Sequence, residues 1–573
     1  MLFRPKSAVK RRYIGLSISL GIVATGSPLV SKAEPWQNLI QPIGVLLVNP
    51  PQSALTVNLF LASLDSNITP ATYPFELSTD VTSIRTTQKL YFARVYNAAS
   101  GSNAVGTWIV RASDLRGKTI AQIRDVLALP SEPDKFTMVE VPEGITMFTG
   151  LAGPIAGWGS GGATQSKLMG PPYVPGANFK NQQVLTDCFL CYRVLAPSGS
   201  GNRVATVLDR NIPVAYSNLD TVYNNLDLLY YEPTAPAFRQ ALASMSGEGA
   251  TGAQTVMFAN ASTFINAISQ ETRNWVTRPR ALNASDTPQG VAANRMWASL
   301  SGGRSRVDGT QGAATLNSSG ANLQIGTDRN LNANIMAGFA VGGGQANYSV
   351  NDLNTNGNLN LFNLSVYTVT RMDNAYIAST LAYSRAWTKI DRDVAVNTLA
   401  NRQKGSFTGQ TASVRLEAGY VHKTGNLSLT PFVALEPTWL WQPSFSEQMS
   451  ATNTPVNMGL NYQSVHSRSL PASLGLQVES KIEMENGWQL RPTAQASWIY
   501  EFSPDREVTA ALQLLPNQPF TVAGAAAPRN RGLISLGLVA TSRTGTSAYF
   551  TLDTAFSNTT IGFLAQAGVR IPF

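Results

Sequence analysis

The C-terminal half of the sequence alternates apolar and polar side chains with a period of two, and the clearest run spans residues 488–501. Adjacent side chains of a strand point to opposite faces, so this run predicts a strand with one apolar and one polar face. Trp488, Trp498 and Tyr500 stand near the two ends of the apolar face. Aromatic residues gather at both interfaces of a membrane barrel, which favours a membrane strand over a strand of a soluble β-sandwich.

Similar runs recur from about residue 293 to the end, separated by Gly, Asn and Asp turns. They predict about twelve strands of a transmembrane β-barrel, near residues 294–304, 318–328, 333–344, 359–371, 374–387, 408–423, 426–437, 465–481, 487–502, 530–542, 547–556 and 563–573. An even number of strands returns both ends to the periplasmic side. The long connections 443–464 and 503–529 follow odd-numbered strands, so both are predicted to face outward.

The composition and the N-terminus agree with an exported membrane protein. Charged residues form only 13% of the chain, about half the usual share, and no apolar run after the N-terminus is long enough for a membrane helix. Residues 1–33 predict a signal peptide: a basic start, an apolar stretch from Tyr13 to Val23, and cleavage after Ala33. The net charge of +9 owes much to this segment. No other basic cluster follows, so no nucleic-acid partner is expected.

Two stretches resemble the autotransporter (type V secretion) β-barrel family. The first runs from Trp297 through Gly302-Gly303 and 323–328 to 335–342, and the second comprises 520–524, 529–531 and 568–573. The resemblance implies a bacterial outer-membrane protein whose partners are the lipid bilayer and the barrel-insertion machinery. It also implies that the terminal aromatic Phe573 serves as the signal for that machinery.

The segment just upstream of the barrel predicts a helix from Pro236 to about Trp275. Its Met245-Ser246-Gly247-Glu248 resembles the segment that precedes barrels of this family, which implies a linker helix threaded through the lumen. An amphipathic helix in the core of the N-terminal domain is the alternative. Asn260 lies where some family members cleave their passenger, but it lacks a neighbouring Asn, so a retained passenger is expected. The predicted units are a passenger at 34–235, a linker helix and loop at 236–290 and the barrel at 291–573.

The predicted passenger has a small α+β pattern without repeats. Strands are expected at 90–96, 107–110 and 136–141, a helix at 119–129, a strand at 188–195, and surface loops at 171–177 and 197–201. Cys188 and Cys191 predict one small disulfide loop in an exported protein, and no metal site is expected. The two histidines, His422 and His466, both lie in the barrel. The passenger therefore cannot hold a Ser-His-Asp triad or a His-ligated zinc.

Short motifs between residues 94 and 165 are similar in order to NAD-consuming toxin domains of the ADP-ribosyltransferase type. The resemblance implies that Arg94 holds a pyrophosphate, that Tyr96 or Trp108 stacks on the nicotinamide, and that Gln165 orients the ribose. NAD would then be a substrate, and no resident cofactor is expected. The structural alternative makes Arg94 a charge at a strand end and Trp108 a core aromatic residue.

The leading functional prediction is an outer-membrane autotransporter that exports and displays its own N-terminal passenger at the cell surface, for adhesion or another surface interaction. The host or surface ligand is not identified by the sequence. One alternative is a passenger enzyme that consumes NAD. The other is a pore with an N-terminal domain in the periplasm.

Overall fold

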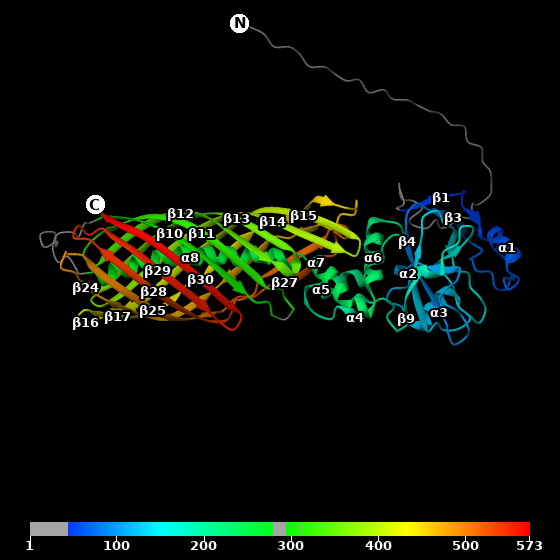
Figure 1. The fold of residues 1–573 in the computed structure, drawn as a ribbon, viewed down its shortest axis with the longest axis horizontal. Coiled ribbons are helices and arrows are strands. Elements are labelled where there is room, and N and C mark those ends of the chain that lie inside the picture. The colour runs from blue at the N-terminus through cyan, green and yellow to red at the C-terminus, as the bar shows by residue number, and fades with distance from the viewer. Residues whose placement is uncertain (1–43, 279–293, 311) are drawn as a thin grey trace, which may run out of the picture.

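The computed structural model describes residues 44–278, 294–310 and 312–573. An α+β domain lies at one end of an elongated molecule, a group of helices in the middle and a β-barrel at the other end (Figure 1). The predicted signal peptide and its cleavage site at Ala33 lie outside the described residues. So does the predicted boundary between linker and barrel at 290/291.

The α+β domain is built on an antiparallel sheet that has nine strands within the described residues, in the order β1-β3-β7-β8-β5-β4-β6-β9 with β2 beside β3. Helix α3 begins at a capping box of Thr119 and Gln122, which satisfies its first amides, and ends at Ala128 in the left-handed conformation. The strands are β1 Val45–Leu47, β2 Gln52–Ser53, β3 Asp80–Thr86, β4 Leu90–Tyr96, β5 Trp108–Val110, β6 Lys135–Val141, β7 Thr146–Leu151, β8 Thr164–Leu168 and β9 Phe179–Val184, and the helices are α1 Ala54–Leu64, α2 Ala112–Leu115 and α3 Ile120–Leu127.

A group of helices connects this domain to the barrel. They are α4 Tyr192–Leu195, α5 Gly199–Asp209, α6 Asn218–Leu229, α7 Ala235–Ser244 and α8 Thr251–Thr277. The strand predicted at 188–195 is wrong, because α4 occupies its second half and packs Tyr192 into the helical core. The predicted loop at 197–201 is also wrong in part, since α5 begins at Gly199.

The single helix predicted from Pro236 to Trp275 is broken into α7 and α8. Gly247 adopts a left-handed backbone (φ +70°), which ends α7 and turns the chain before α8 begins. A Cβ at Gly247 would stand 2.4 Å from Leu460 Cδ1. The turn therefore fits only without a side chain against the end of the barrel next to the helices, which we call the outer end.

The barrel closes through antiparallel pairing of its first and last strands, β10 and β30, from Arg295 opposite Pro572 to Val307 opposite Thr560. Counting interrupted segments together, the described residues form 12 strands, which confirms the predicted fold class. The strands are β10 Asn294–Val307, β11 Leu316–Asn330, β12 Ile335–Val350, β13 Thr355–Met372, β14 Ala375–Val396, β15 Leu399–Tyr420 continued by β16 His422–Thr424, β17 Leu427–Leu435 with β18 Thr438–Gln442 and β20 Gln448–Thr452, β22 Val465–Ser469 with β23 Pro471–Ser480 and β24 Ile482–Glu483, β25 Gln489–Glu501, β28 Asn530–Thr541, β29 Ser547–Phe556 and β30 Thr560–Pro572.

The alternation predicted for residues 488–501 is present in β25. Its even-numbered side chains, such as Trp498, lie on the outer face, whereas Arg491, Ser497 and Glu501 are buried on the inner face. Exposed leucines, valines and aromatic residues cover the outer face of the other strands in the same way. This apolar belt is the surface that a barrel presents to lipid.

Two strands extend far beyond their predicted ends. Each of β14 and β15 has 22 residues, although the prediction ended the first at 387 and began the second at 408. A strand that spans the bilayer needs only about 10 residues, so this hairpin continues well outside the membrane. The connections predicted as loops at 443–464 and 503–529 also contain strands. Of these, β19 Phe445–Ser446, β21 Leu460–Tyr462, β26 Glu507–Leu512 and β27 Phe520–Ala523 form a four-stranded sheet at the outer end.

The apolar belt predicts that the same substitution at two exposed leucines changes the free energy of unfolding by unequal amounts. Leu381 is 55% exposed in the middle of the lipid-facing part of β14, whereas Leu331 is 62% exposed in the turn after β11. We expect Leu381→Arg to lower the free energy of unfolding by about 2–4 kcal/mol, because the charge would lie in hydrocarbon. Leu331→Arg should change it by less than about 0.5 kcal/mol. Urea unfolding in lipid vesicles measures both values, and equal effects would contradict the assignment of the belt.

Candidate functional site: the barrel lumen and its helix

Helix α8 fills the lumen of the barrel (Figure 1). It has 27 residues, so it is about 40 Å long and sufficient to run through the barrel. Phe264, Ile265 and Ile268 are buried against inward-facing residues of β10, β12 and β13 such as Trp297 and Met336. Within the described residues, no helix is both long and apolar enough to cross a membrane.

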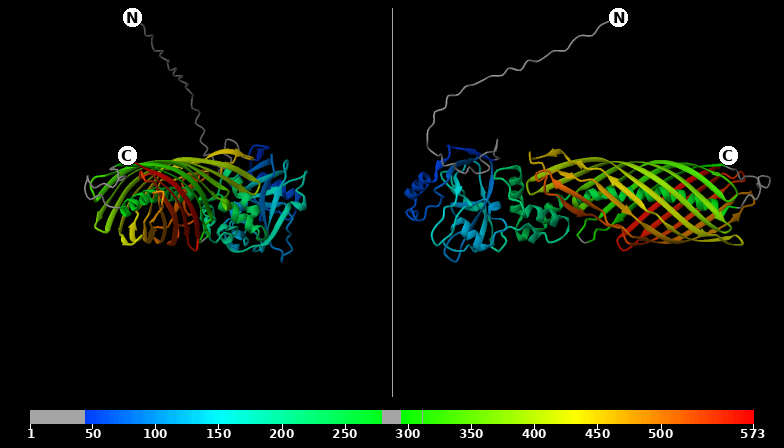
Figure 2. Two further views of the ribbon diagram at one scale, coloured as in Figure 1. Left: turned by 60° about the vertical axis from the view of Figure 1, so that its left-hand side comes forward. Right: turned by 180° about the vertical axis from the view of Figure 1, so that it is seen from behind.

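The two ends of α8 lie at opposite ends of the barrel. At its start, Gln254 donates a hydrogen bond of 2.7 Å to the backbone carbonyl of Glu507, which belongs to the outer sheet. At its end, Trp275 donates to Asn330 (2.6 Å), the last residue of β11, and Lys423 donates to the carbonyl of Thr277 (3.1 Å). The helix therefore runs from the outer sheet to the end of the barrel that carries both barrel termini, as the two views in Figure 2 also show.

Ion pairs fix the last turns of α8 to the barrel wall. Glu271 accepts hydrogen bonds from Arg570 of β30 (2.8 Å) and lies 3.3 Å from Arg295 of β10. Arg273 pairs with Glu417 of β15 at 2.9 Å. All of these side chains are buried, so each charge depends on its partner for stabilisation. The pairing orients the helix about its axis, because each charge meets a different strand.

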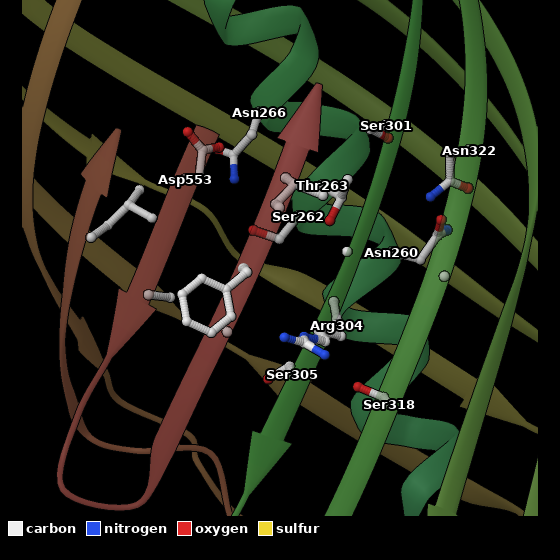
Figure 3. Close-up of a pocket in the computed structure, with 18 of the residues that line it drawn as sticks. Asn260, Ser262, Thr263, Asn266, Ser301, Arg304, Ser305, Ser318, Asn322 and Asp553 are labelled. Atoms are coloured by element: carbon white, nitrogen blue, oxygen red, sulfur yellow. The ribbon is translucent and has the colours of Figure 1, made fainter. Parts of the chain in front are cut away.

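A polar cavity of about 240 Å³ remains beside α8 (Figure 3). Ser262, Thr263 and Asn266 of the helix face it, and Ser301, Arg304 and Ser318 face it from the barrel wall. Asn260 donates a hydrogen bond of 2.8 Å to Asn363 of β13. Small polar side chains thus separate the helix from one side of the wall.

The outer end of the lumen is closed by an apolar core. Phe407, Phe445 and Tyr462 stack on one another with ring centroids 4.9 and 4.4 Å apart, and residues of α5–α7 belong to the same cluster. Arg392 of β14 is buried there in an ion pair with Glu447, and it donates to the carbonyl of Ser244 at the end of α7 (2.5 Å). The helices therefore pack directly on the mouth of the barrel.

The structure brings the four residues of the NAD hypothesis to one cavity of about 330 Å³ in the α+β domain: Arg94, Tyr96, Trp108 and Gln165. Gln165 donates its amide hydrogen bond to the carbonyl of Pro74 (2.6 Å) rather than facing the cavity unpaired. Tyr96 donates to Gln182 (3.2 Å). These contacts do not test NAD chemistry, which stays a prediction.

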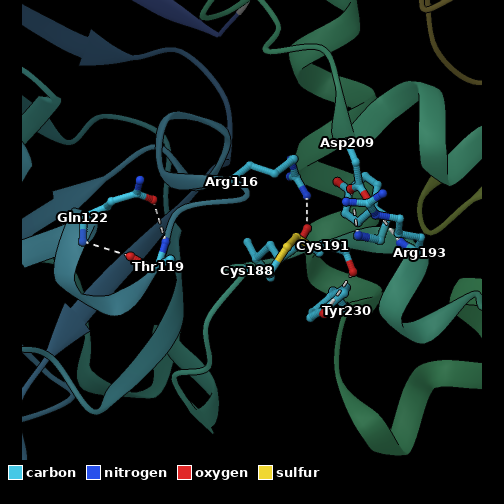
Figure 4. The surroundings of a disulfide bond; sticks show 10 residues. Arg116, Thr119, Gln122, Cys188, Cys191, Arg193, Asp209 and Tyr230 are labelled. Carbon is cyan, nitrogen blue, oxygen red and sulfur yellow. Dashed lines mark hydrogen bonds and ion pairs between the residues drawn. A yellow bond between two sulfur atoms is a disulfide. The ribbon is translucent and has the colours of Figure 1, made fainter.

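Cys188 and Cys191 are joined by a disulfide between the α+β domain and α4 (Figure 4). The loop also places Leu190, whose carbonyl accepts a hydrogen bond of 2.5 Å from Arg116. Phe573 is 61% exposed at the end of β30, and its backbone amide donates to the carbonyl of Asn294 (3.1 Å). Within the described residues, no group of side chains is arranged to hold a metal ion.

The sequence analysis missed the charged residues that hold α8. Glu271 and Arg273 are charged residues within a neutral stretch of the helix, and Glu417 and Arg570 lie on the polar faces of their strands. Charges on the inner face of a barrel and on the helix predicted to fill it are a signal for pairing. Which charge meets which could not be predicted without the register of the strands.

Residues 296–553 match the family model of the autotransporter β-domain. The barrel is an autotransporter β-domain. This confirms the predicted family of the barrel and its location in the bacterial outer membrane. Among curated protein sequences, none matches this chain.

Solved structures similar to the β-domain include two autotransporter barrels. The translocator domain of NalP from Neisseria meningitidis is 17% identical with a TM-score of 0.42, and the match covers 55% of this chain and 98% of that one. The β-domain of BrkA from Bordetella is 17% identical with a TM-score of 0.36, over 49% of this chain and 100% of that one.

The ion pairs predict that one carboxyl group of α8 stabilises the β-domain. We expect Glu271→Gln to lower the free energy of unfolding by about 3–5 kcal/mol, because it leaves Arg570 buried without its partner. Ser262→Ala, on the same helix but facing the polar cavity, is the matched control, with an expected change below about 0.5 kcal/mol. Urea titration of the detergent-solubilised protein gives both values. Similar midpoints for the two variants would mean that the pairing does not hold the helix.

Proposed function

We propose that the chain exports its N-terminal domain through the β-domain and keeps it displayed at the cell surface, for adhesion or another surface interaction. The observation that carries this proposal is α8, which joins the N-terminal domain to the barrel by way of the lumen. A pore with a separate periplasmic domain does not require a connecting segment inside its barrel.

The two ends of the barrel support an orientation in which the N-terminal domain lies outside the cell. The turns 331–334, 373–374 and 425–426 are short and lie at the end that carries Asn294 and Phe573. Outer-membrane barrels direct short turns to the periplasm and longer connections to the exterior. The long hairpin of β14 and β15, the four-stranded sheet and the N-terminal domain are all at the opposite end.

We further propose that the passenger stays attached. The ion pairs of Glu271 and Arg273, the hydrogen bond of Gln254 and the apolar core at the mouth hold the chain along its whole path through the lumen. Asn224 and Asn225 are adjacent in the sequence, before the predicted linker. Asn225 is buried in α6 and accepts a hydrogen bond from Thr398 (2.9 Å), which leaves it inaccessible for cleavage.

We propose that the barrel-insertion machinery recognises the last strand. Phe573 is an exposed aromatic residue at the end of an alternating strand, and β30 must pair with β10 before the barrel is closed. A free last strand with a row of unpaired backbone groups offers such a machine an edge for β-pairing.

Cysteine labelling of intact cells tests the orientation. Tyr173→Cys places a thiol on the N-terminal domain at a side chain that is 73% exposed. Glu485→Cys places one in the short turn between β24 and β25. The native cysteines are joined in a disulfide, so they do not react. We expect a membrane-impermeant maleimide to label Tyr173→Cys on intact cells and Glu485→Cys only after the outer membrane is permeabilised.

The reverse pattern would support the pore with a periplasmic domain and reject display. Labelling at both positions on intact cells would indicate leaky cells, which a periplasmic marker protein in the same sample reveals. An immunoblot of the membrane fraction then checks retention, because an attached passenger gives one band of the full mature length.

A further inference from the structure

A cavity of the α+β domain is lined by residues 93–96 of β4, 108–110 of β5 and Gln165 of β8. The segments 127–133 and 153–158 border it on the other side. Its volume of about 330 Å³ is at the small end of the range for metabolite pockets. It is distinct from the barrel lumen, and nothing in the proposed export function uses it.

A single charged side chain lines this cavity. The lining residues, all described, include no Asp, Glu, Lys or His, so Arg94 is not neutralised by a carboxylate there. Its Nε and Nη1 donate to the backbone carbonyls of Asn103 and Trp108, both at 3.0 Å. Its Nη2 makes no hydrogen bond within the described residues. Burial lowers the pKa of Arg94, and a cation taken out of water without an acidic partner favours the approach of an anion.

The neighbourhood is shaped around this guanidinium. A Cβ on Gly106 would stand 2.3 Å from Arg94 Cζ, so a side chain at this position would displace the guanidinium from where it lies. Lys167 adds a second positive charge on the ring of Trp108, with Nζ 5.0 Å from the centroid, and donates to Thr107 (2.7 Å). Burial lowers the pKa of Lys167, against the opposing charge of Asp65, and the positive charge of Arg94 adds to the lowering.

The rest of the wall is mainly apolar and aromatic. Trp108 and Trp158 line the cavity, together with Leu129, Pro133 and Ile155. Flat aromatic walls favour a flat aromatic body in the ligand. A guanidinium with a free nitrogen favours a carboxylate, through charge-assisted hydrogen bonds.

We propose that this cavity binds a small aromatic carboxylate, with the carboxylate on Arg94 and the ring between Trp108 and Trp158. The ligand is a monoanion of metabolite size, since one guanidinium lines the cavity and its volume is about 330 Å³. This binding does not depend on the side of the membrane that the domain occupies, so it can hold even if surface display is rejected.

Equilibrium dialysis of the full-length protein in lipid nanodiscs tests the proposal, with empty nanodiscs as the blank. The probes are 2-naphthoate and its neutral amide, 2-naphthamide. We expect naphthoate to bind at least about tenfold more tightly than the amide, because only the acid offers a charged acceptor. Raising NaCl from about 0.05 M to 0.5 M should weaken the binding of the acid but not that of the amide.

Three variants locate the site, and a fourth serves as the control. Arg94→Gln should lose about tenfold in naphthoate affinity and leave naphthamide unchanged. Arg94→Lys should keep part of the preference for the acid, because it retains the charge. Trp158→Ala, at the partly exposed wall, should weaken the binding of both probes. Arg210→Gln removes an exposed cation of α5 and should change neither.

The outcomes separate an anion site from a merely structural arginine. If Arg94 only holds the 97–108 loop in place, Arg94→Gln and Arg94→Lys will affect acid and amide equally, and the proposal is wrong. No measurable naphthoate binding by the native protein at millimolar concentration would also overturn it. Equal binding of acid and amide would show an apolar cavity without an anion site.

Discussion

Backbone hydrogen bonding in a medium without water is the constraint on which the rest of this structure depends. Within lipid, every strand must find partners on both sides, so the sheet has to close on itself. The ladder between β10 and β30 closes it. A barrel of this size leaves a lumen that side chains from the wall alone do not fill. Helix α8 fills that lumen, and because a helix satisfies its own backbone, only its side chains need partners there.

The charged side chains of α8 set the orientation of the helix more than they stabilise the fold. Burying an ion pair costs desolvation that the attraction between the charges barely offsets, so Glu271 and Arg273 add little net free energy compared with apolar residues. Their effect is selective: any rotation or shift of α8 along the barrel would leave Arg570 buried without a carboxylate partner. Arg295 would keep its ion pair with Asp328, and Glu417 would keep Arg415. The small uncharged residues of the helix that line the cavity, such as Ser262, tolerate such movements and do not define a register.

Local periodicity was sufficient to predict the barrel, because one face of each strand must meet lipid and the other must not. The twelve strands follow from it, whereas the position of the linker helix in the lumen was implied by the resemblance of Met245-Ser246-Gly247-Glu248 to the segment before barrels of the autotransporter family. Local periodicity was not sufficient to predict elements whose bounds or type depend on tertiary packing. Strand β14 packs against α6 and α7, and α4 forms because Tyr192 packs into a helical core rather than a sheet. The four residues Arg94, Tyr96, Trp108 and Gln165 do share one cavity, yet nothing in the local sequence indicates that Gln165 donates a hydrogen bond to the carbonyl of Pro74.

A continuous path of buried contacts runs from the α+β domain to the far end of the barrel, which carries both barrel termini. Arg116, from the domain, is buried against Asp227 of α6 at 2.5 Å, with Tyr192 between them and α7. Helix α7 then meets Arg392 of the barrel through the carbonyl of Ser244, and α8 continues through the lumen to Glu271. A flexible linker would leave exposed backbone between these units, whereas here each junction is packed and paired. The α+β domain is therefore held at a fixed distance from the membrane, with its cavity far from the lipid, because the same apolar core that closes the barrel mouth also anchors the helices that carry the domain.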